Sequence, residues 1–422
     1  MKTIIYNIKA LYTSTQTPPV KGKKMRDISV IENPYIVIED GLITTIGTGD
    51  IDDVKCEADF VYDAKQTIMI PGLVDSHTHL VFGGSREHEF KRKIEGVPYL
   101  DILKQGGGIL YTVEETRKAS FQTLYDQALH SLNEMLLFGV TSLEMKSGYG
   151  LDFDTEMKQL KVAKALNQHH PIDISTTYLG AHAIPKEFEK NRKQYIEKMI
   201  QYLSVIKEED LADFVDVFCE TGVFTAAETK YILEEAKKQG FQLRVHTDEI
   251  DSIGGTKVAV DLGAKTVDHL VQITDEDIVH LAKSNTIANL LPSTSFFLNK
   301  TYAPARKMID QGVAIAVSSD YNPGSTPSEN YQLTLQVAGN KLRMLPLEIL
   351  TAATINPAYS LDKSDIIGSI EVGKQADLVL LDCPNIDYFI YHYGINHTFA
   401  VFKRGKLVVH QRKIVGEMNE IS

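Results

Sequence analysis

The chain has little cysteine and no long apolar run, and each scarcity excludes a class of protein. Its 422 residues include only three cysteines, Cys56, Cys219 and Cys383, which lie far apart and form no Cys-x-x-Cys pair. A disulfide-stapled miniprotein is therefore excluded, and a zinc site built from thiolates is not indicated. No segment offers the roughly 18 consecutive apolar residues of a membrane span, and the first residues lack the apolar core and cleavage site of a secretory signal. We therefore expect a cytoplasmic protein.

Positive charge is also scarce. Lys and Arg number 44 against 56 Asp and Glu, which gives a formal net charge of -12. This balance repels the phosphates of nucleic acids and of anionic lipids, so we expect neither a nucleic-acid nor a membrane partner. Hydrophobic residues make up 43% of the chain, which is enough to bury a substantial core.

Short β-rich segments lie near both ends of the chain. Residues 35–39 and 42–47 are β-branched runs joined by Asp40-Gly41, a dipeptide typical of tight hairpin turns. A second hairpin is predicted near the C-terminus, with strands at 398–402 and 407–409. We expect residues 1–66 and 368–422 to form one composite β-sandwich domain.

Between these ends, apolar runs alternate with amphipathic stretches, such as 114–138 and 226–239. This alternation predicts parallel strands joined by helical crossovers. Eight such units match a (β/α)8 TIM barrel of the α/β class, expected over residues 67–367, and a doubly wound open sheet is the competing layout. The eight expected strands are 68–74, 140–145, 173–179, 214–219, 241–246, 265–268, 286–291 and 313–319.

Histidines and one aspartate fall at the ends of these predicted strands. His77 and His79 are two residues apart, so on a strand their imidazoles point to the same side. His246, His269 and Asp320 end the fifth, sixth and eighth runs. Because the carboxyl ends of barrel strands converge, we expect these side chains to meet, although Asp320 alone could equally be a helix cap.

The sequence resembles the amidohydrolase superfamily of metal-dependent hydrolases over nearly its whole length. The resemblance is carried by PGLVDSHTH at 71–79, the later single histidines, Ser318-Ser319-Asp320 and GKQADLV at 373–379. It implies a metal site whose ligands are His77, His79, His246 and Asp320.

One divalent ion, zinc or iron, is the expected cofactor. Binuclear relatives often place a metal-bridging lysine at the fourth strand end, where this chain has Phe218-Cys219-Glu220. A single-ion site is therefore the better expectation. His and carboxylate ligands suit both zinc and iron, so the sequence leaves the choice between the two metals open.

Further motifs are similar to a branch of this superfamily that opens the ring of 4-imidazolone-5-propanoate in histidine degradation. They are HTHLVFGGSR at 77–86, QGGGI at 105–109, KSGYG at 146–150, LGAH at 179–182 and DYNPGS at 320–325. The resemblance implies hydrolysis of a non-peptide C–N bond in a cyclic amide, with N-formimidoyl-L-glutamate as the product. The attacking water is expected to be activated by the metal.

Site roles follow from this expected substrate. Glu249, His269 and Asp320 are the candidate proton handlers, and the sequence leaves open which of them is the base. Arg86 offers a guanidinium fork to the carboxylate arm of the substrate. The other candidate substrate contacts are Tyr149, His182, Glu249, Asn322, Gly324 and Ser325.

Two alternative functions remain open at this point. One is a single-metal deaminase of a purine-like or pyrimidine-like ring, which would give Arg86 no carboxylate to bind. The other is a non-catalytic barrel scaffold, which would be expected to have lost metal ligands. A homodimer is expected only from the general frequency of twofold assemblies. The glycines at 106–108 predict either a lid over 104–110 or a plain turn.

Overall fold

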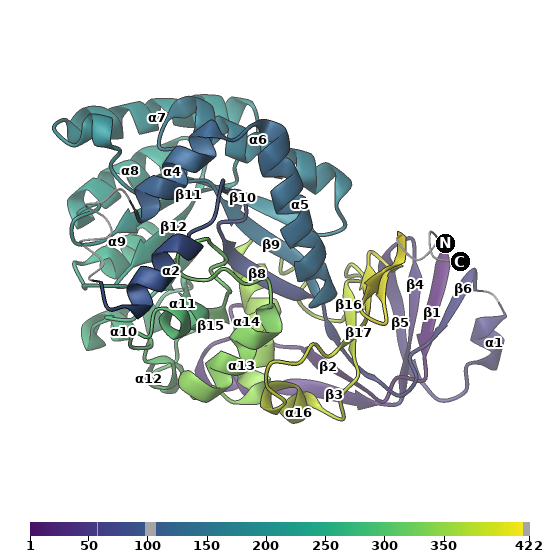
Figure 1. Cartoon of the computed structure of the whole chain (residues 1–422). Coiled ribbons are helices and arrows are strands. Elements are labelled where there is room, and N and C mark those ends of the chain that lie inside the picture. Colours follow the sequence, from purple (N-terminus) through teal and green to yellow (C-terminus); the bar gives the residue numbers. More distant parts are fainter. Residues whose placement is uncertain (57, 98–106, 417–422) are drawn as a thin grey trace.

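A closed barrel of parallel strands forms the larger part of the computed structural model, which describes residues 1–56, 58–97 and 107–416 (Figure 1). The eight strands follow one another around a single sheet in chain order. The loop after the last strand closes the ring, because Asp320 N–H donates to the His77 carbonyl at 3.1 Å and His79 N–H donates to the Tyr321 carbonyl at 2.8 Å. The expected (β/α)8 barrel is therefore confirmed. Its strands are β8 (Leu73–Thr78), β9 (Val140–Lys146), β10 (Asp173–Ala181), β11 (Phe214–Cys219), β12 (Gln242–Thr247), β13 (Thr266–His269), β14 (Ile287–Leu290) and β15 (Ile315–Val317).

Helices surround this barrel, and several of them begin at side-chain caps that the sequence supplies. Thr225 and Glu228 form a capping box at the start of α8, and Ser120 accepts the N–H of Thr123 at the start of α5. The cap at Ser120 divides the expected helix 114–138 into α4 and α5. The helices are α2 (Glu87–Ile94), α4 (Ile109–Lys118), α5 (Phe121–Leu137), α6 (Phe153–His169), η2 (Lys186–Phe188), α7 (Arg192–Glu208), α8 (Ala226–Lys238), α9 (Gly255–Leu262), α10 (Asp275–Ala282), α11 (Pro292–Phe297), α12 (Ala305–Asp310), α13 (Tyr331–Lys341), α14 (Pro346–Ala353) and α15 (Ile355–Ser360).

Two further sheets lie beside the barrel (Figure 1). The four-stranded sheet takes its strands from the N-terminal part alone, and the seven-stranded sheet draws strands from both ends of the chain. Buried side chains from both ends, among them Ile5, Leu11, Leu378 and Phe402, share one hydrophobic core. The four-stranded sheet contains β5 (Leu42–Thr48), β4 (Pro34–Glu39), β1 (Lys2–Tyr6) and β6 (Phe60–Asp63). The seven-stranded sheet contains β19 (Lys413–Ile414), β18 (Lys406–His410), β17 (Thr398–Lys403), β16 (Leu378–Leu381), β7 (Ile68–Pro71), β2 (Ala10–Ser14) and β3 (Ile28–Glu32). The remaining short helices are η1 (Gly22–Arg26), α1 (Asp52–Lys55) and α16 (Ile386–Tyr391).

The expected first barrel strand, 68–74, is in fact divided between two sheets. Its first half is β7, which pairs with β16 and β2, and only β8 enters the barrel. The change of sheet occurs at Gly72, whose N–H donates to the Asp377 carbonyl, while the next N–H, of Leu73, donates to the Gly139 carbonyl. The apolar run is continuous because both halves are buried, so hydrophobicity alone does not reveal the break.

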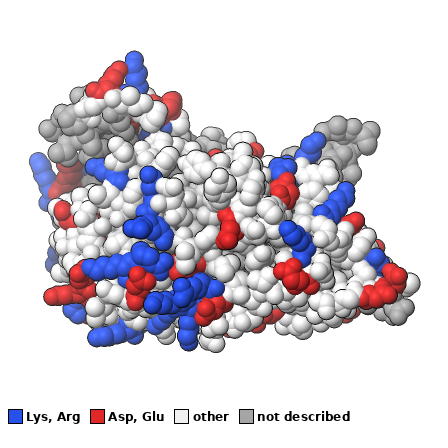
Figure 2. Space-filling model, turned by 90° about the horizontal axis from the view of Figure 1, so that it is seen from below, with Lys and Arg blue, Asp and Glu red and all other residues white. Residues whose placement is uncertain are grey.

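The charged surface mixes both signs on the face shown in Figure 2. Lys and Arg side chains gather in the left half of that view and are interspersed with Asp and Glu. Within the described ranges, no helix is both long and apolar enough to cross a bilayer. The predicted lid at 104–110 lies partly outside the described residues.

Gly72 gives a test of the junction between the two sheets. A Cβ built there would lie 2.1 Å from Thr141 Oγ1 on β9, so Gly72→Ala forces the junction and β9 apart. We expect the free energy of unfolding to fall by about 1–3 kcal/mol, measured by chemical denaturation. Gly416→Ala is the control, because nothing lies within 4 Å of its Cβ. Equal stability of the two variants would contradict the assigned packing.

Candidate metal centre

Histidine and carboxylate side chains from distant parts of the chain meet at the mouth of the barrel. His77, His79 and Asp320 form one group whose ligand atoms all lie within 4.8 Å of one another. His77, His246 and His269 form a second such group. The four predicted metal ligands are therefore connected through His77, which belongs to both groups.

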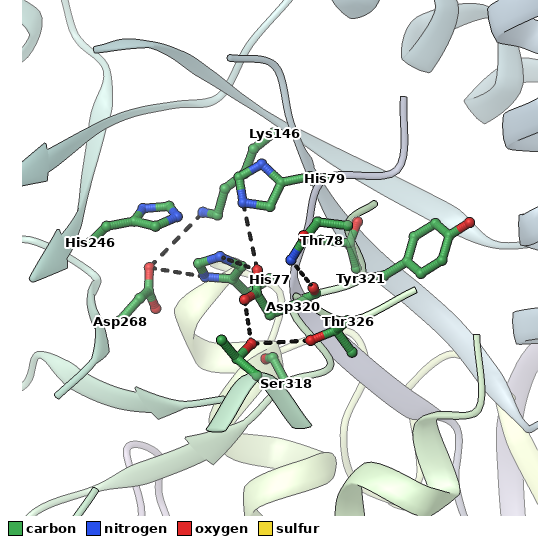
Figure 3. Close-up of polar contacts among 12 residues, drawn as sticks. His77, Thr78, His79, Lys146, His246, Asp268, Ser318, Asp320, Tyr321 and Thr326 are labelled. Carbon is green, nitrogen blue, oxygen red and sulfur yellow. Dashed lines mark hydrogen bonds and ion pairs between the residues drawn. The ribbon is translucent and has the colours of Figure 1, made fainter. Parts of the chain in front are cut away.

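The ligand atoms face one another in a buried space (Figure 3). Asp320 Oδ1 lies 3.5 Å from His77 Nε2 and 3.6 Å from His79 Nε2. The His77 and His246 ring centroids are 4.5 Å apart. Both of these rings are buried, and no described residue is a hydrogen-bond partner of either Nε2 atom. Buried nitrogens without a hydrogen-bond partner fit the requirements of a bound cation.

Backbone pairing brings Asp320 to this position. Its hydrogen bond to the His77 carbonyl, described above, places it beside β8, and its φ of +55° turns the chain sharply there. Thr294 Oγ1 donates to Asp320 Oδ2 at 2.5 Å and fixes the carboxylate. No described helix begins at Asp320, and the next helix, α13, is capped by Asn330, so the helix-cap alternative is wrong.

A layer of buried charged side chains lies beneath the histidines and was not predicted from the sequence. Asp216 Oδ2 lies 2.9 Å from His246 Nδ1, and Asp268 Oδ2 lies 3.4 Å from His77 Nδ1. Lys146 Nζ donates to Asp216 Oδ2 at 2.9 Å. Carboxylates in such positions orient imidazole ligands. The available signal was charged residues within otherwise apolar strands, as in FVDVFC on β11 and LEMK on β9.

The surroundings keep two of the imidazoles neutral. Burial and the Lys146 ammonium lower the pKa of His77 well below its ordinary value. Burial and the neighbouring His182 ring do the same to the pKa of His79. A neutral imidazole keeps a lone pair for a cation. At His246, burial opposes protonation, but the carboxylate of Asp216 prevails and raises the pKa.

Two of the predicted proton handlers face each other across the mouth. His269 Nε2 lies 3.8 Å from Glu249 Oε2, and Glu249 is only partly buried. Burial lowers the pKa of His269 to about 4, so that ring is neutral near pH 7. Burial raises the pKa of Glu249 above its ordinary value. A neutral ring beside a carboxyl of raised pKa can exchange a proton with a bound ligand.

Arg86 lies at the wall of a cavity of about 400 Å³ and is already paired. Its Nε and Nη2 donate to Glu89 Oε2 at 3.1 and 2.9 Å. The third nitrogen, Nη1, faces the loop after β15, because a Cβ built at Gly324 would lie 2.1 Å from it. Glu89 therefore binds two of the three guanidinium nitrogens that were expected to face a substrate carboxylate, and the contact of Arg86 with substrate stays a prediction.

Tyr149 and His182 lie against the histidine group, as expected for residues near a substrate. The His182 ring stacks on His79 with centroids 5.0 Å apart, and the Tyr149 ring is 5.5 Å from His79. His182 Nδ1 lies 3.0 Å from the Gly148 carbonyl. Only a protonated Nδ1 can donate to a carbonyl, so Nε2 of the neutral ring is an acceptor.

The loop after Asp320 is held by its own hydrogen bonds. Asn322 Nδ2 donates to the Asp320 carbonyl at 2.7 Å and to Ser325 Oγ at 2.8 Å. Asn322 Oδ1 accepts the N–H groups of Gly324 and Ser325, each at 2.8 Å. The donors that the sequence assigned to substrate contacts shape the loop in this structure, and their contact with substrate stays a prediction.

Comparison of the sequence with known proteins points to one family. The model of the amidohydrolase family matches residues 68–410. A protein from Fusobacterium nucleatum named imidazolonepropionase is 51% identical over 407 residues, covering 96% of this chain and 98% of that protein. A protein of the same name from Streptococcus sanguinis is 50% identical over 405 residues, covering 94% of this chain and 95% of that protein.

Solved structures share the fold at much lower identity. An adenosine deaminase from Xanthomonas campestris with bound zinc has a TM-score of 0.71 and 18% identity, covering 98% of this chain and 94% of its own. The guanine deaminase of E. coli has a TM-score of 0.72 and 14% identity, covering 97% of this chain and 99% of its own. At these identities the likeness concerns the fold alone.

Asp216→Asn tests whether the buried carboxylates support a metal centre. The change removes the charge that faces His246 Nδ1 and leaves Lys146 without one of its carboxylates. We expect the affinity for zinc to fall about 10- to 100-fold, measured by competition with a chromophoric chelator. Asp213→Asn, on an exposed residue just before the same strand, is the matched control. Equal zinc affinity in both variants would contradict the assigned support.

Proposed function

The chain belongs to the amidohydrolase family and, within it, to the proteins named imidazolonepropionase, and on that premise we propose its reaction and site roles. It hydrolyses the cyclic amide C–N bond of 4-imidazolone-5-propanoate and releases N-formimidoyl-L-glutamate, a step of histidine degradation. The observation that carries this proposal is the identity of about half of all residues to imidazolonepropionases over nearly the full length. The site described above supplies the groups that the chemistry needs.

One divalent ion, zinc or iron, would be held by His77, His79, His246 and Asp320. When bound, the ion acts as a Lewis acid that makes hydroxide available near neutral pH and polarises a carbonyl. A single ion is favoured because Lys146 already supplies a positive charge between Asp216 and Asp268. A second cation at that place would have to displace a fully buried ammonium.

Hydrolysis requires a proton to leave the water and another to reach the departing ring nitrogen. Glu249 and His269 handle these protons, because they face each other beside the metal ligands. Asp320 shares in the removal of the water proton through the oxygen that faces His77 and His79. The C–N bond breaks as the nitrogen accepts its proton, so the ring opens with one water consumed.

The ring and the carboxylate arm of the substrate are bound by the surrounding loops. His182 accepts an N–H of the substrate ring through Nε2, and Tyr149, which packs against His182, contacts the substrate through its hydroxyl. The Nη1 edge of Arg86 contacts the carboxylate arm. Glu249, Asn322, Gly324 and Ser325 complete the substrate contacts around the mouth. In this assignment the barrel expected at residues 67–367 forms the catalytic domain, except for β7, which belongs with residues 1–66 and 368–422 to the accompanying β domain.

A direct assay tests the reaction and its metal dependence. We expect the purified protein to consume 4-imidazolone-5-propanoate, to lose activity after chelation and to regain it with zinc or iron. Guanine, adenosine and cytosine, assayed for ammonia release, test the deaminase alternative. Turnover of one of these bases without turnover of the imidazolone would contradict the proposal, and a protein inert with every metal would favour the scaffold.

Arg86→Ala tests the carboxylate contact. Loss of a charge-assisted hydrogen bond of about 2–3 kcal/mol should raise KM about 30- to 150-fold while the bound metal stays the same. His246→Ala should instead lose metal and turnover together. Arg412→Ala is the control, because it breaks an arginine–carboxylate pair, with Asp382, on the terminal sheets. Unchanged steady-state kinetics of Arg86→Ala would refute the contact.

A further inference from the structure

The carboxylate of Glu220 is buried at the end of β11 and surrounded by backbone N–H groups. Its Oε2 accepts the N–H of Glu249 at 3.1 Å and of Ile250 at 2.9 Å. Its Oε1 accepts the N–H of Asp251 at 3.0 Å and of Thr221 at 2.8 Å. Three consecutive N–H groups of the loop after β12 therefore converge on one carboxylate from the neighbouring strand.

These hydrogen bonds compensate the negative charge of the buried Glu220 carboxylate. The carboxylate forms no ion pair with any residue in the described part of the chain, so the four N–H donors compensate its burial. Both oxygens already accept two hydrogen bonds each, which leaves the carboxylate no site for a reacting molecule. Its role is therefore to hold the loop and not to contact substrate.

Asp248, the first residue of the same loop, is also held by hydrogen bonds. This residue has a φ of +55°, and its carboxylate accepts hydrogen bonds from Thr256 Oγ1 at 2.7 Å and Thr247 Oγ1 at 3.1 Å. The segment that follows forms no helix or strand before α9. The backbone N–H of Glu249 is thus held by the Glu220 carboxylate, and the residue before it, Asp248, is anchored by its own side chain, in place of regular secondary structure.

We propose that Glu220 is a positioning residue that fixes the backbone of Glu249 and thereby aims the Glu249 carboxyl at the reacting atoms. This inference rests on the proposed role of Glu249 in proton transfer. Proton transfer requires donor and acceptor at hydrogen-bond distance, and a misplacement of about 1 Å can cost about 100-fold in rate. Substrate binding depends mainly on other loops, so displacement of this loop should affect kcat more than KM.

Glu220→Gln is the test, because it keeps the side-chain shape and replaces one acceptor oxygen with a donor that opposes the loop N–H groups. We expect kcat to fall about 10- to 100-fold, with KM within about twofold and zinc per chain unchanged. A kcat equal to that of the wild type would overturn the proposal, as would loss of zinc together with a raised KM. If this variant is insoluble, Glu220→Asp withdraws the carboxylate by one methylene and should lower kcat in the same direction.

Glu228→Gln is the matched control. Glu228 also accepts a backbone N–H, from Thr225 at 2.9 Å, in the segment that follows β11. Glu228 pairs with Arg192 and makes no hydrogen bond or ion pair with the loop of Glu249 within the described residues, so its loss should lower stability and leave kcat near the wild-type value. An equal fall of kcat in Glu228→Gln would show a general effect of the segment and would overturn the specific role of Glu220.

A double variant separates a positioning role from a structural one. In a Glu249→Gln background, Glu220→Gln should lower kcat by no more than about twofold, because the group that it positions is already gone. A further tenfold loss would overturn the proposal. Wild-type protein that fails to hydrolyse the imidazolone would refute the proposed function itself. Active wild type with an unaffected Glu220→Gln would refute only this inference.

Discussion

The ammonium of Lys146 in the barrel interior balances the carboxylates that support the metal centre. It donates to Glu144 Oε1 at 2.8 Å and to Asp216 Oδ2 at 2.9 Å, and it lies 4.0 Å from Asp268 Oδ2. Unpaired, these fully buried carboxylates would cost several kcal/mol each. Two of them, Asp216 and Asp268, face Nδ1 of His246 and of His77. They orient these rings and leave the Nε2 atom of each ring for a cation. The orientation of the His77 and His246 rings therefore depends on this charge balance.

A second constraint acts on the loops that carry the proposed substrate contacts. Three of these loops, those of Tyr149, Glu249 and Asn322, are each held by one side chain that accepts several backbone N–H groups. Glu156 accepts the N–H groups of residues 148, 150 and 151 around Tyr149, and Glu220 does the same for the loop of Glu249. Asn322 holds its own loop, as described above. These loops lie outside the barrel strands, so the acceptors add the rigidity that a binding site requires.

The sequence was sufficient for the barrel and for the convergence of the histidines, because apolar runs alternate with helices and strand ends meet by topology. It did not reveal the division of 68–74 between two sheets, since both halves are equally buried. It also did not reveal the pairing of Arg86 with Glu89, because residues three apart pair only once a helix has formed. Lys146, Asp216 and Asp268 were visible as charges in apolar strands, but which of them touch depends on the register between strands.

The proposed metal ligands are positioned by strands and the proposed substrate contacts by loops, which explains how one barrel accommodates different chemistry. Three of the four proposed metal ligands lie on or next to strands, and the fourth, Asp320, is tied to β8 by a backbone hydrogen bond, so their spacing follows from the barrel itself. Arg86, Tyr149 and His182 lie on loops, where substitutions leave that spacing intact. The fold is shared with deaminases at 14% to 18% identity, so the barrel by itself does not specify a substrate. Specificity for a carboxylate-bearing ring must therefore come from the loops, where the proposed contact is the guanidinium of Arg86, whose charge is opposite to that of the arm.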